Sequence, residues 1–140
     1  MSINSKAAPV VFNNVTKVYG KDVVAVDNIN LKIEAGKLVT LLGPSGCGKT
    51  TTLRMIAGLE MATKGSIFIG DSDVTLLPAT DRDVSMVFQS YALFPHMSVM
   101  ENVAYGLGFS GFDKSETKDR AVQGLDLVGL KGYGDRLPSE

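Results

Sequence analysis

The feature that most constrains this chain is a glycine-rich segment that directly follows a short apolar run. Residues 37–42 form that run, and residues 43–51 read Gly43-Pro44-Ser45-Gly46-Cys47-Gly48-Lys49-Thr50-Thr51. A short apolar run is typical of a buried parallel strand, and residues 52–56 favour a helix that ends at Gly58. The pattern Gly-x-x-x-x-Gly-Lys-Thr between a strand and a helix predicts a phosphate-binding loop.

The residue types explain how such a loop binds a phosphate chain. Its glycines permit backbone turns that direct successive N–H groups inward, and the helix, which is expected to begin near Lys49, adds positive potential at its start. We expect Lys49 to bring a full positive charge to the β and γ phosphates, Thr50 to ligate Mg²⁺, and Thr51 to donate on the α-phosphate side. Cys47 is interpreted as a small filler residue rather than a nucleophile. A glycine turn that only caps a helix is the alternative, but strand, loop and helix all agree on a binding site.

Composition and charge exclude several classes of protein. A chain of 140 residues with 44% hydrophobic residues suits one modest folded domain and not a disordered chain. A net charge of −1 argues against a general nucleic-acid binder, so no nucleic-acid partner is expected. The single cysteine excludes an internal disulfide, and there is neither a membrane-spanning run nor a secretory signal. We therefore expect a cytoplasmic location.

Strand patterns surround the loop. The β-branched segments 10–19 and 23–33 are separated by Gly20-Lys21-Asp22 and predict an antiparallel hairpin. Residues 65–70 and 84–88 predict two further strands.

The pattern becomes helical from residue 98. Ser98 and Glu101 have capping-box spacing and predict a short helix that reaches Leu107. Asp113 and Glu116 predict a second start. The face that this second helix is expected to bury consists of Ala121, Val122, Leu125 and Val128.

One further segment, Val84-Ser-Met-Val-Phe-Gln-Ser-Tyr-Ala-Leu-Phe-Pro-His96, makes a family resemblance plain. This segment resembles the glutamine loop of ATP-binding cassette (ABC) ATPases, with Gln89 as the matching glutamine. The segment from Gly43 to Thr51 resembles the phosphate loop of the same family. The resemblance extends from about Val10 to Glu140. It implies an α/β, P-loop NTPase-type nucleotide-binding domain with N-terminal antiparallel strands, a partial parallel core sheet and the start of a helical subdomain.

The resemblance also implies a domain division. Residues 1–9 would be a flexible N-terminus, residues 10–97 the nucleotide-binding α/β core, and residues 98–140 the start of the helical subdomain.

The family's site residues carry over to matching positions. Tyr19 would stack on adenine; the alternative is a strand residue that covers the sheet. Gln89 would help to bind Mg²⁺ and to position the attacking water; the alternative is a polar residue at a strand end. With Lys49, Gln89 would be catalytic, and the cofactors would be ATP and Mg²⁺.

Partners follow from the same resemblance. The apolar segment Tyr91–Met100 would dock onto membrane-spanning permease subunits, the alternative being inward packing. The ATPase subunits would form a homodimer on the cytoplasmic face of the membrane, and a periplasmic solute-binding protein would act indirectly. The branch that the chain resembles serves polyamines, ferric iron, phosphonates or sugars.

Several family motifs are not found in these 140 residues. The chain ends at Glu140, before the Leu-Ser-Gly-Gly-Gln signature, the later strand ending in Asp-Glu and the switch histidine; His96 lies too early to be that histidine. The segments Val23–Asp27 and Asp126–Gly129 only mimic the missing carboxylate motifs. We therefore expect a truncated ATPase chain that binds nucleotide weakly and is deficient in hydrolysis on its own.

Two other functional classes stay open. A nucleotide kinase or GTPase also uses a phosphate loop, although Tyr19, the Gln89 segment and the lack of an Asn-Lys-x-Asp motif argue against it. A non-catalytic nucleotide-binding module is kept open by the missing motifs.

Overall fold

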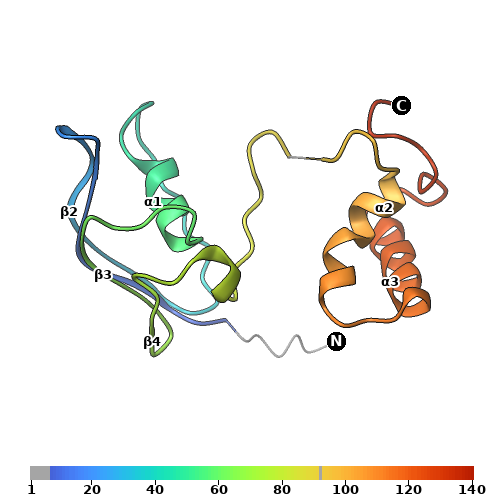
Figure 1. Ribbon diagram of the computed structural model, residues 1–140, viewed down its shortest axis with the longest axis horizontal. Coiled ribbons are helices and arrows are strands. Elements are labelled where there is room, and N and C mark those ends of the chain that lie inside the picture. The colour runs from blue at the N-terminus through green and yellow to red at the C-terminus, as the bar shows by residue number, and fades with distance from the viewer. Residues whose placement is uncertain (1–6, 92) are drawn as a thin grey trace. The chain divides into compact units, whose positions relative to one another are not determined.

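The computed structural model describes residues 7–91 and 93–140, so residues 1–6 of the predicted flexible terminus lie outside it. The chain divides into two compact units, one that ends at Met86 and one from Val87 to Glu140 (Figure 1). The domain division predicted after residue 97 stays a prediction. The first unit contains β1 (Val10–Tyr19), β2 (Val23–Ile33), α1 (Lys49–Ile56), β3 (Lys64–Ile69), β4 (Ser72–Asp73) and a 3₁₀ turn (Ala79–Asp81). The second contains α2 (Val99–Ala104), a 3₁₀ segment (Tyr105–Phe109) and α3 (Lys114–Leu127).

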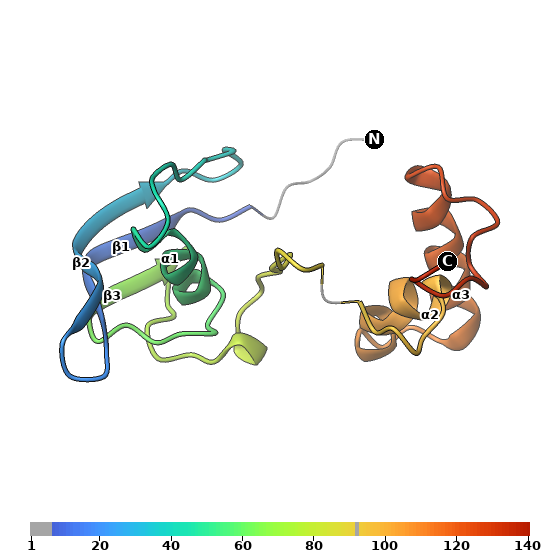
Figure 2. The ribbon, with the colours of Figure 1, turned by 90° about the horizontal axis from the view of Figure 1, so that it is seen from above.

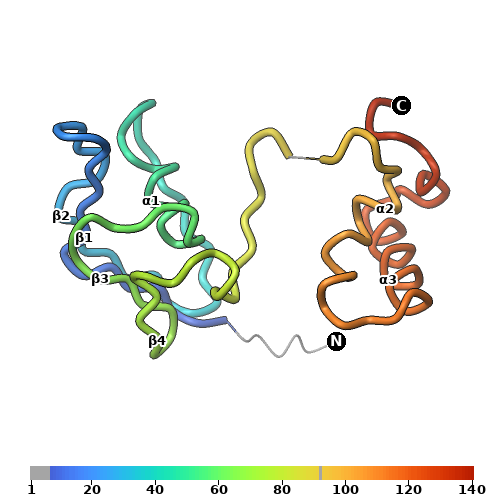
Figure 3. The backbone as a smooth tube through the Cα atoms, viewed as in Figure 1, coloured from blue at the N-terminus to red at the C-terminus, as the bar shows by residue number. Residues whose placement is uncertain are grey.

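An antiparallel sheet with the order β2-β1-β3-β4 forms the frame of the first unit. The hairpin of β1 and β2 runs from the pair Val10↔Ile33 to the pair Tyr19↔Val23, so the predicted hairpin is confirmed (Figure 3). The other edge of β1 pairs with β3, which confirms the strand predicted at 65–70. The hairpin end that carries Tyr19 is thus held by strands rather than by a loop.

The core of the first unit lies between this sheet and α1, which covers one face of the sheet (Figure 2). Met55 of α1 is fully buried against side chains from three strands, among them Phe12, Val26 and Ile67. Full burial of one such side chain contributes about 1.5–3 kcal/mol before entropy is counted. This packing fixes α1 on the sheet, and with it the loop from which α1 begins.

Two strand predictions are wrong. Residues 37–42 and 84–88 adopt no strand, and Leu38, Leu42 and Val87 are 98%, 88% and 82% exposed. A buried parallel strand needs neighbours that pair with its N–H and C=O groups on both sides. Among residues 7–91 and 93–140 no strand pairs with either segment, so the expected parallel part of the sheet does not form there.

The second unit packs α2 against α3, which lie side by side in Figures 1 and 3. Both predicted helix starts are confirmed, and Ala121 and Leu125 of α3 are buried as expected. Val122 and Val128 are 38% and 68% exposed, which corrects that part of the predicted face. The first helix ends as an α-helix at Ala104 and continues as a 3₁₀ segment, since Gly106 and Gly108 weaken an α-helix. No helix in the described parts of the chain is long and apolar enough to cross a membrane.

Candidate functional site

The loop from Gly43 to Thr51 has a backbone that requires glycine. Gly46 and Gly48 have φ angles of 83° and 88°, a region that side chains strongly disfavour. A Cβ at Gly48 would collide with the carbonyl oxygen of Ala25, and a Cβ at Gly43 would lie 2.6 Å from Cys47 Sγ. The glycines therefore serve both the turns of the loop and its close contact with β2.

The helix that follows the loop has an open N-terminus. Gly48 is its N-cap and supplies no side-chain hydrogen bond, and its first turn holds no acidic residue. Within the described residues, the amides of Lys49, Thr50 and Thr51 have no acceptor. Unpaired amides at the positive end of a helix dipole are a site for an anion.

Lys49 adds a full charge at this end. Its Nζ donates to the carbonyl oxygens of Gly43 and Pro44, both at 2.7 Å, and lies 3.3 Å from Cys47 Sγ. Across the parts of the chain that the structure describes, no carboxylate pairs with Lys49. The ammonium is therefore held inside the loop by neutral groups, and its charge is available to a phosphate.

A cavity of about 280 Å³ opens beside the loop, and the side chains and backbone of its lining fit a magnesium–phosphate group. The hydroxyl of the exposed Thr50 has no hydrogen-bond partner in the described residues, and a hard hydroxyl oxygen suits Mg²⁺. No cluster of three or more His, Cys, Asp or Glu is present in the described residues. Among the residues that line this cavity, Thr50 would therefore be the one to hold a cation, together with the phosphates themselves. The lining residues are Ala25, Ser45, Gly46, Gly48, Lys49, Thr50 and Thr51.

Tyr19 is joined to the loop through its own hairpin. It pairs with Val23 at the end of β1, and the next part of β2, Ala25 and Val26, touches Gly48. The ring is half-buried, with Lys17 Nζ 4.8 Å from its centroid. One strand pair therefore positions an aromatic ring and supports the phosphate-loop backbone.

Gln89 belongs to the second unit, where it is exposed in a turn that the amide of Tyr91 closes on the carbonyl of Phe88, at 2.9 Å. The strand end on which we expected Gln89 does not form. Exposed apolar side chains follow: Tyr91, Leu93 and Phe94 are 75%, 55% and 38% exposed. His96 is exposed too, and its ring meets Phe94 edge-on at 6.0 Å.

Asn102 fixes the conformation of this apolar segment, a role that the sequence pattern did not indicate. Its side chain accepts from the amide of Phe94 at 2.9 Å and donates to the carbonyls of Phe94, Met97 and Ser98. An asparagine inside a helical pattern carries no signal of such a role.

Arg82 also has a structural role that the sequence pattern did not indicate. It is only 6% exposed, and its guanidinium donates to the carbonyls of Met55, Ile56 and Leu77. Burial lowers the pKa of Arg82. Because two of these carbonyls end α1, Arg82 caps the helix whose other end forms the loop. The acidic residues on either side of Arg82 in the sequence predict a solvated loop instead.

Comparisons with known proteins show which family the chain resembles. A family model described as "ABC transporter" matches residues 26–140. The chain is 66% identical over 131 residues to the "Fe(3+) ions import ATP-binding protein FbpC" of Brucella abortus (strain 2308), covering 94% of this chain and 37% of the relative. It is 62% identical over 138 residues to the protein of the same name from Agrobacterium fabrum, covering 99% of this chain and 39% of the relative. The chain thus spans less than two fifths of the length of these curated relatives.

Solved structures show the same fold. A dimeric structure of MJ0796, a bacterial ABC transporter cassette, has a TM-score of 0.81 and 30% identity, with 93% of this chain and 62% of that chain covered. A post-hydrolysis dimer of the ATP-binding cassette MJ0796 bound to ADP and Pi has a TM-score of 0.76. These neighbours confirm the predicted P-loop NTPase-type α/β fold. Because the family model matches most of its length, the chain belongs to the ABC transporter family.

Proposed function

We propose that this chain is the ATP-binding, energy-coupling part of an ABC importer, and that ferric ions are the solute. The geometry of the loop carries the proposal. Among the described residues, the amides of residues 49–51 have no acceptor, the Lys49 ammonium has no carboxylate partner and the Thr50 hydroxyl has no hydrogen bond, and these groups belong to residues that line one cavity. The ferric-ion assignment is supported by the names of relatives that share 62–66% of its residues.

Within this proposal, each side chain has a defined task. Lys49 and the amides of residues 49–51 bind the phosphates, and Tyr19 stacks on adenine. Thr50 and, in the complete protein, Gln89 would hold Mg²⁺, which would neutralise phosphate charge when bound. Gln89 orients the attacking water, and hydrolysis in the complete protein drives transport.

The partners are the second part of the proposal. The exposed apolar side chains within Tyr91–Met100 dock onto membrane-spanning permease subunits, which places the protein on the cytoplasmic face of the membrane. Two ATPase subunits clamp together around ATP, as the dimeric cassette neighbours support. A periplasmic binding protein delivers the solute to the permease.

Calorimetry of the full-length chain with Mg·ATP tests the proposal. Lys49→Ala is expected to weaken binding about 10- to 100-fold, because hydrogen bonds to a charged group are worth ~1.5–3 kcal/mol. The matched control is Lys37→Ala, which removes an exposed cation outside the loop and should leave affinity unchanged. Equal affinities for wild type and Lys49→Ala would refute the phosphate-binding role. Ferric-ion uptake by cells that carry only the Lys49→Ala protein should fall in parallel, whereas normal uptake would contradict the energy-coupling role.

A further inference from the structure

Lys17 is a lysine that is packed into the structure rather than solvated. Its side chain is only 13% exposed, and its Nζ lies 4.8 Å from the centroid of the Tyr19 ring. At that distance an ammonium is attracted to the negative face of an aromatic ring. Lys17 and Tyr19 are two positions apart on β1, so their side chains leave the same face of the strand.

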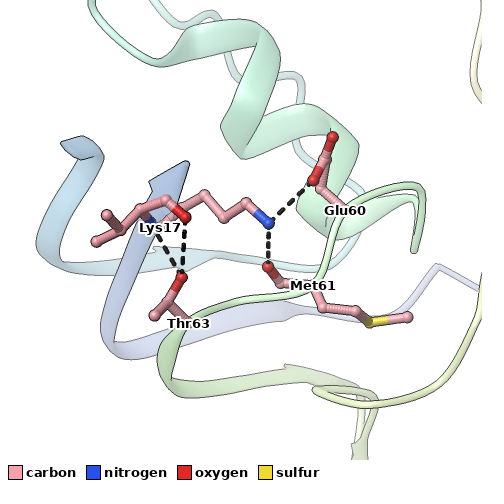
Figure 4. A network of polar contacts seen from close by, with 5 residues as sticks. Lys17, Glu60, Met61 and Thr63 are labelled. Atoms are coloured by element: carbon pink, nitrogen blue, oxygen red, sulfur yellow. Dashed lines mark hydrogen bonds and ion pairs between the residues drawn. The ribbon is translucent and has the colours of Figure 1, made fainter. Parts of the chain in front are cut away.

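Two oxygen atoms fix the ammonium in place (Figure 4). Lys17 Nζ donates to the carbonyl oxygen of Met61 at 2.9 Å and pairs with Glu60 Oε2 at 3.0 Å. The hydrogen bond from Lys17 lowers the pKa of Glu60, and a hydrogen bond from Tyr19 lowers it further. The carboxylate of Glu60 is thus an ion-pair partner of the Lys17 ammonium.

The same region joins the end of β1 to the segment that follows α1. The hydroxyl of Thr63, labelled in Figure 4, accepts from the amide of Val18 at 3.0 Å. The amide of Thr63 donates to the carbonyl of Thr16 at 2.8 Å. Because α1 ends at Ile56, only three residues separate it from Glu60. The contacts of Lys17 thus connect the aromatic ring to the helix that begins at the phosphate loop.

This arrangement limits how the ring can lie. The ammonium occupies one face of the Tyr19 ring, so a flat ligand has only the opposite face available. An ion pair for stability alone does not need a ring beside it. The exposed pair of Lys32, near the end of β2, and Glu34, just after it, has no ring contact among the described residues.

We propose that Lys17 and Glu60 are a positioning pair that holds the Tyr19 ring with one face free for a purine base, and so strengthens base binding without touching the nucleotide. The inference rests on the proposed function, because it assumes that Tyr19 is the surface on which the base stacks.

The test compares two ligands on the full-length chain by calorimetry: Mg·ATP, which has a base, and magnesium with inorganic triphosphate, which has none. Lys17→Met keeps the aliphatic stem and is expected to weaken Mg·ATP binding about three- to tenfold. Triphosphate affinity should stay within twofold of wild type. Lys17→Arg should restore Mg·ATP affinity to within about twofold, since a guanidinium also stacks on aromatic rings. Lys32→Met is the matched control and should change neither affinity.

A second protein background, Tyr19→Ala, shows whether Lys17 acts by positioning the Tyr19 ring or by a general effect on nucleotide affinity. In the Tyr19→Ala protein, adding Lys17→Met should cause no further loss of Mg·ATP affinity, because no ring is left to position. Equal losses for both ligands in Lys17→Met, or a further loss in the Tyr19→Ala background, would overturn the proposal.

If the proposed nucleotide-binding function itself is wrong, the measured affinities differ in another way. In that case Tyr19→Ala leaves the ratio of the two affinities at the wild-type value, or Mg·ATP does not bind to the wild type at all. Glu60→Gln, which retains side-chain volume, should lower Mg·ATP affinity by about two- to threefold and gives an answer even if Lys17→Met unfolds.

Discussion

The first turns of α1 and α2 are built in opposite ways. The three first-turn amides of α2 donate to the carbonyls of Arg136 and Gly134, at 2.8 and 2.9 Å, and to Ser98 Oγ at 3.2 Å. The amides of residues 49–51, which form the corresponding turn of α1, have no acceptor in the described chain. Charge differs too, because Glu101 lies in the first turn of α2 whereas α1 has no acidic residue there.

This comparison shows how a sequence can satisfy one helix N-terminus with its own groups and leave another open to an anion. A capping side chain and an acidic first turn neutralise the positive end of a helix with groups of the chain itself. The helix α3 follows this rule through Asp113 and Glu116. In α1, a glycine N-cap and Lys49 leave the same end positive and unpaired, so a ligand is needed to complete it.

The largest expected effect comes from giving α1 the acidic first turn of α2. Thr51→Glu places a carboxylate at the position that Glu101 occupies in α2. Two unit charges roughly 6 Å apart at an effective dielectric constant of ~20 repel by about 3 kcal/mol, so Mg·ATP affinity is expected to fall about 100-fold. Calorimetry measures this loss.

The reverse exchange is the control. Glu101→Thr removes the acid from α2 and should leave Mg·ATP affinity at the wild-type value. Unchanged affinity in Thr51→Glu, with the protein folded, would show that the open end of α1 does not bind phosphate.

A smaller effect is expected from adding a side chain at a glycine of the loop. Gly48→Ala puts a Cβ into the carbonyl of Ala25 at a φ of 88°, and we expect the free energy of unfolding to fall by about 2 kcal/mol. Gly46→Ala is the matched variant, because its φ of 83° is similar but nothing lies within 4 Å of the added Cβ. It should cost only about 1 kcal/mol. Denaturant unfolding compares the two, and equal costs would contradict a tight contact between the loop and β2.

The smallest effect concerns pH. Hydrogen bonds from Ser98, first from its amide, lower the pKa of Glu101 below its usual 4.5. The folded state therefore gains stability from this carboxylate above that value and loses the gain as pH falls through the lowered pKa. We expect the helical signal of α2 to weaken below about pH 4.5 and the weakening to be smaller in Glu101→Gln. Amide exchange of α2 measures it, with Glu34→Gln as a control that should not alter it. An identical acid response in wild type and Glu101→Gln would argue against the capping box as its cause.

Local signals in the sequence predicted much of this structure. The hairpin bounds, the start of α1 near Lys49 and both capped helix starts depend on neighbours within a few residues, and all are confirmed. The roles of Tyr19, Gln89 and the phosphate loop stay predictions, although the backbone that such a loop requires is present.

The errors have a common physical origin. Residues 37–42 read as a strand because they are apolar, but a strand also needs pairing partners distant in the sequence, and apolarity does not say whether these exist. For the same reason, the sequence did not predict which side chains donate hydrogen bonds to carbonyls that are distant along the chain. Lys17 and Arg82 are polar residues in ordinary local patterns, and only the folded chain brings their acceptors at residues 61, 55 and 56 close to them.

The buried guanidinium of Arg82 has a consequence for how the first unit opens. Because it binds the last carbonyls of α1 together with Leu77, neither the helix end nor the turn near residue 79 can detach without stranding a desolvated charge. These two stretches should therefore unfold in one cooperative event in native-state fluctuations, with matched opening free energies. A mutation in the turn would then loosen the C-terminal end of α1, the helix whose N-terminus follows the glycine-rich loop.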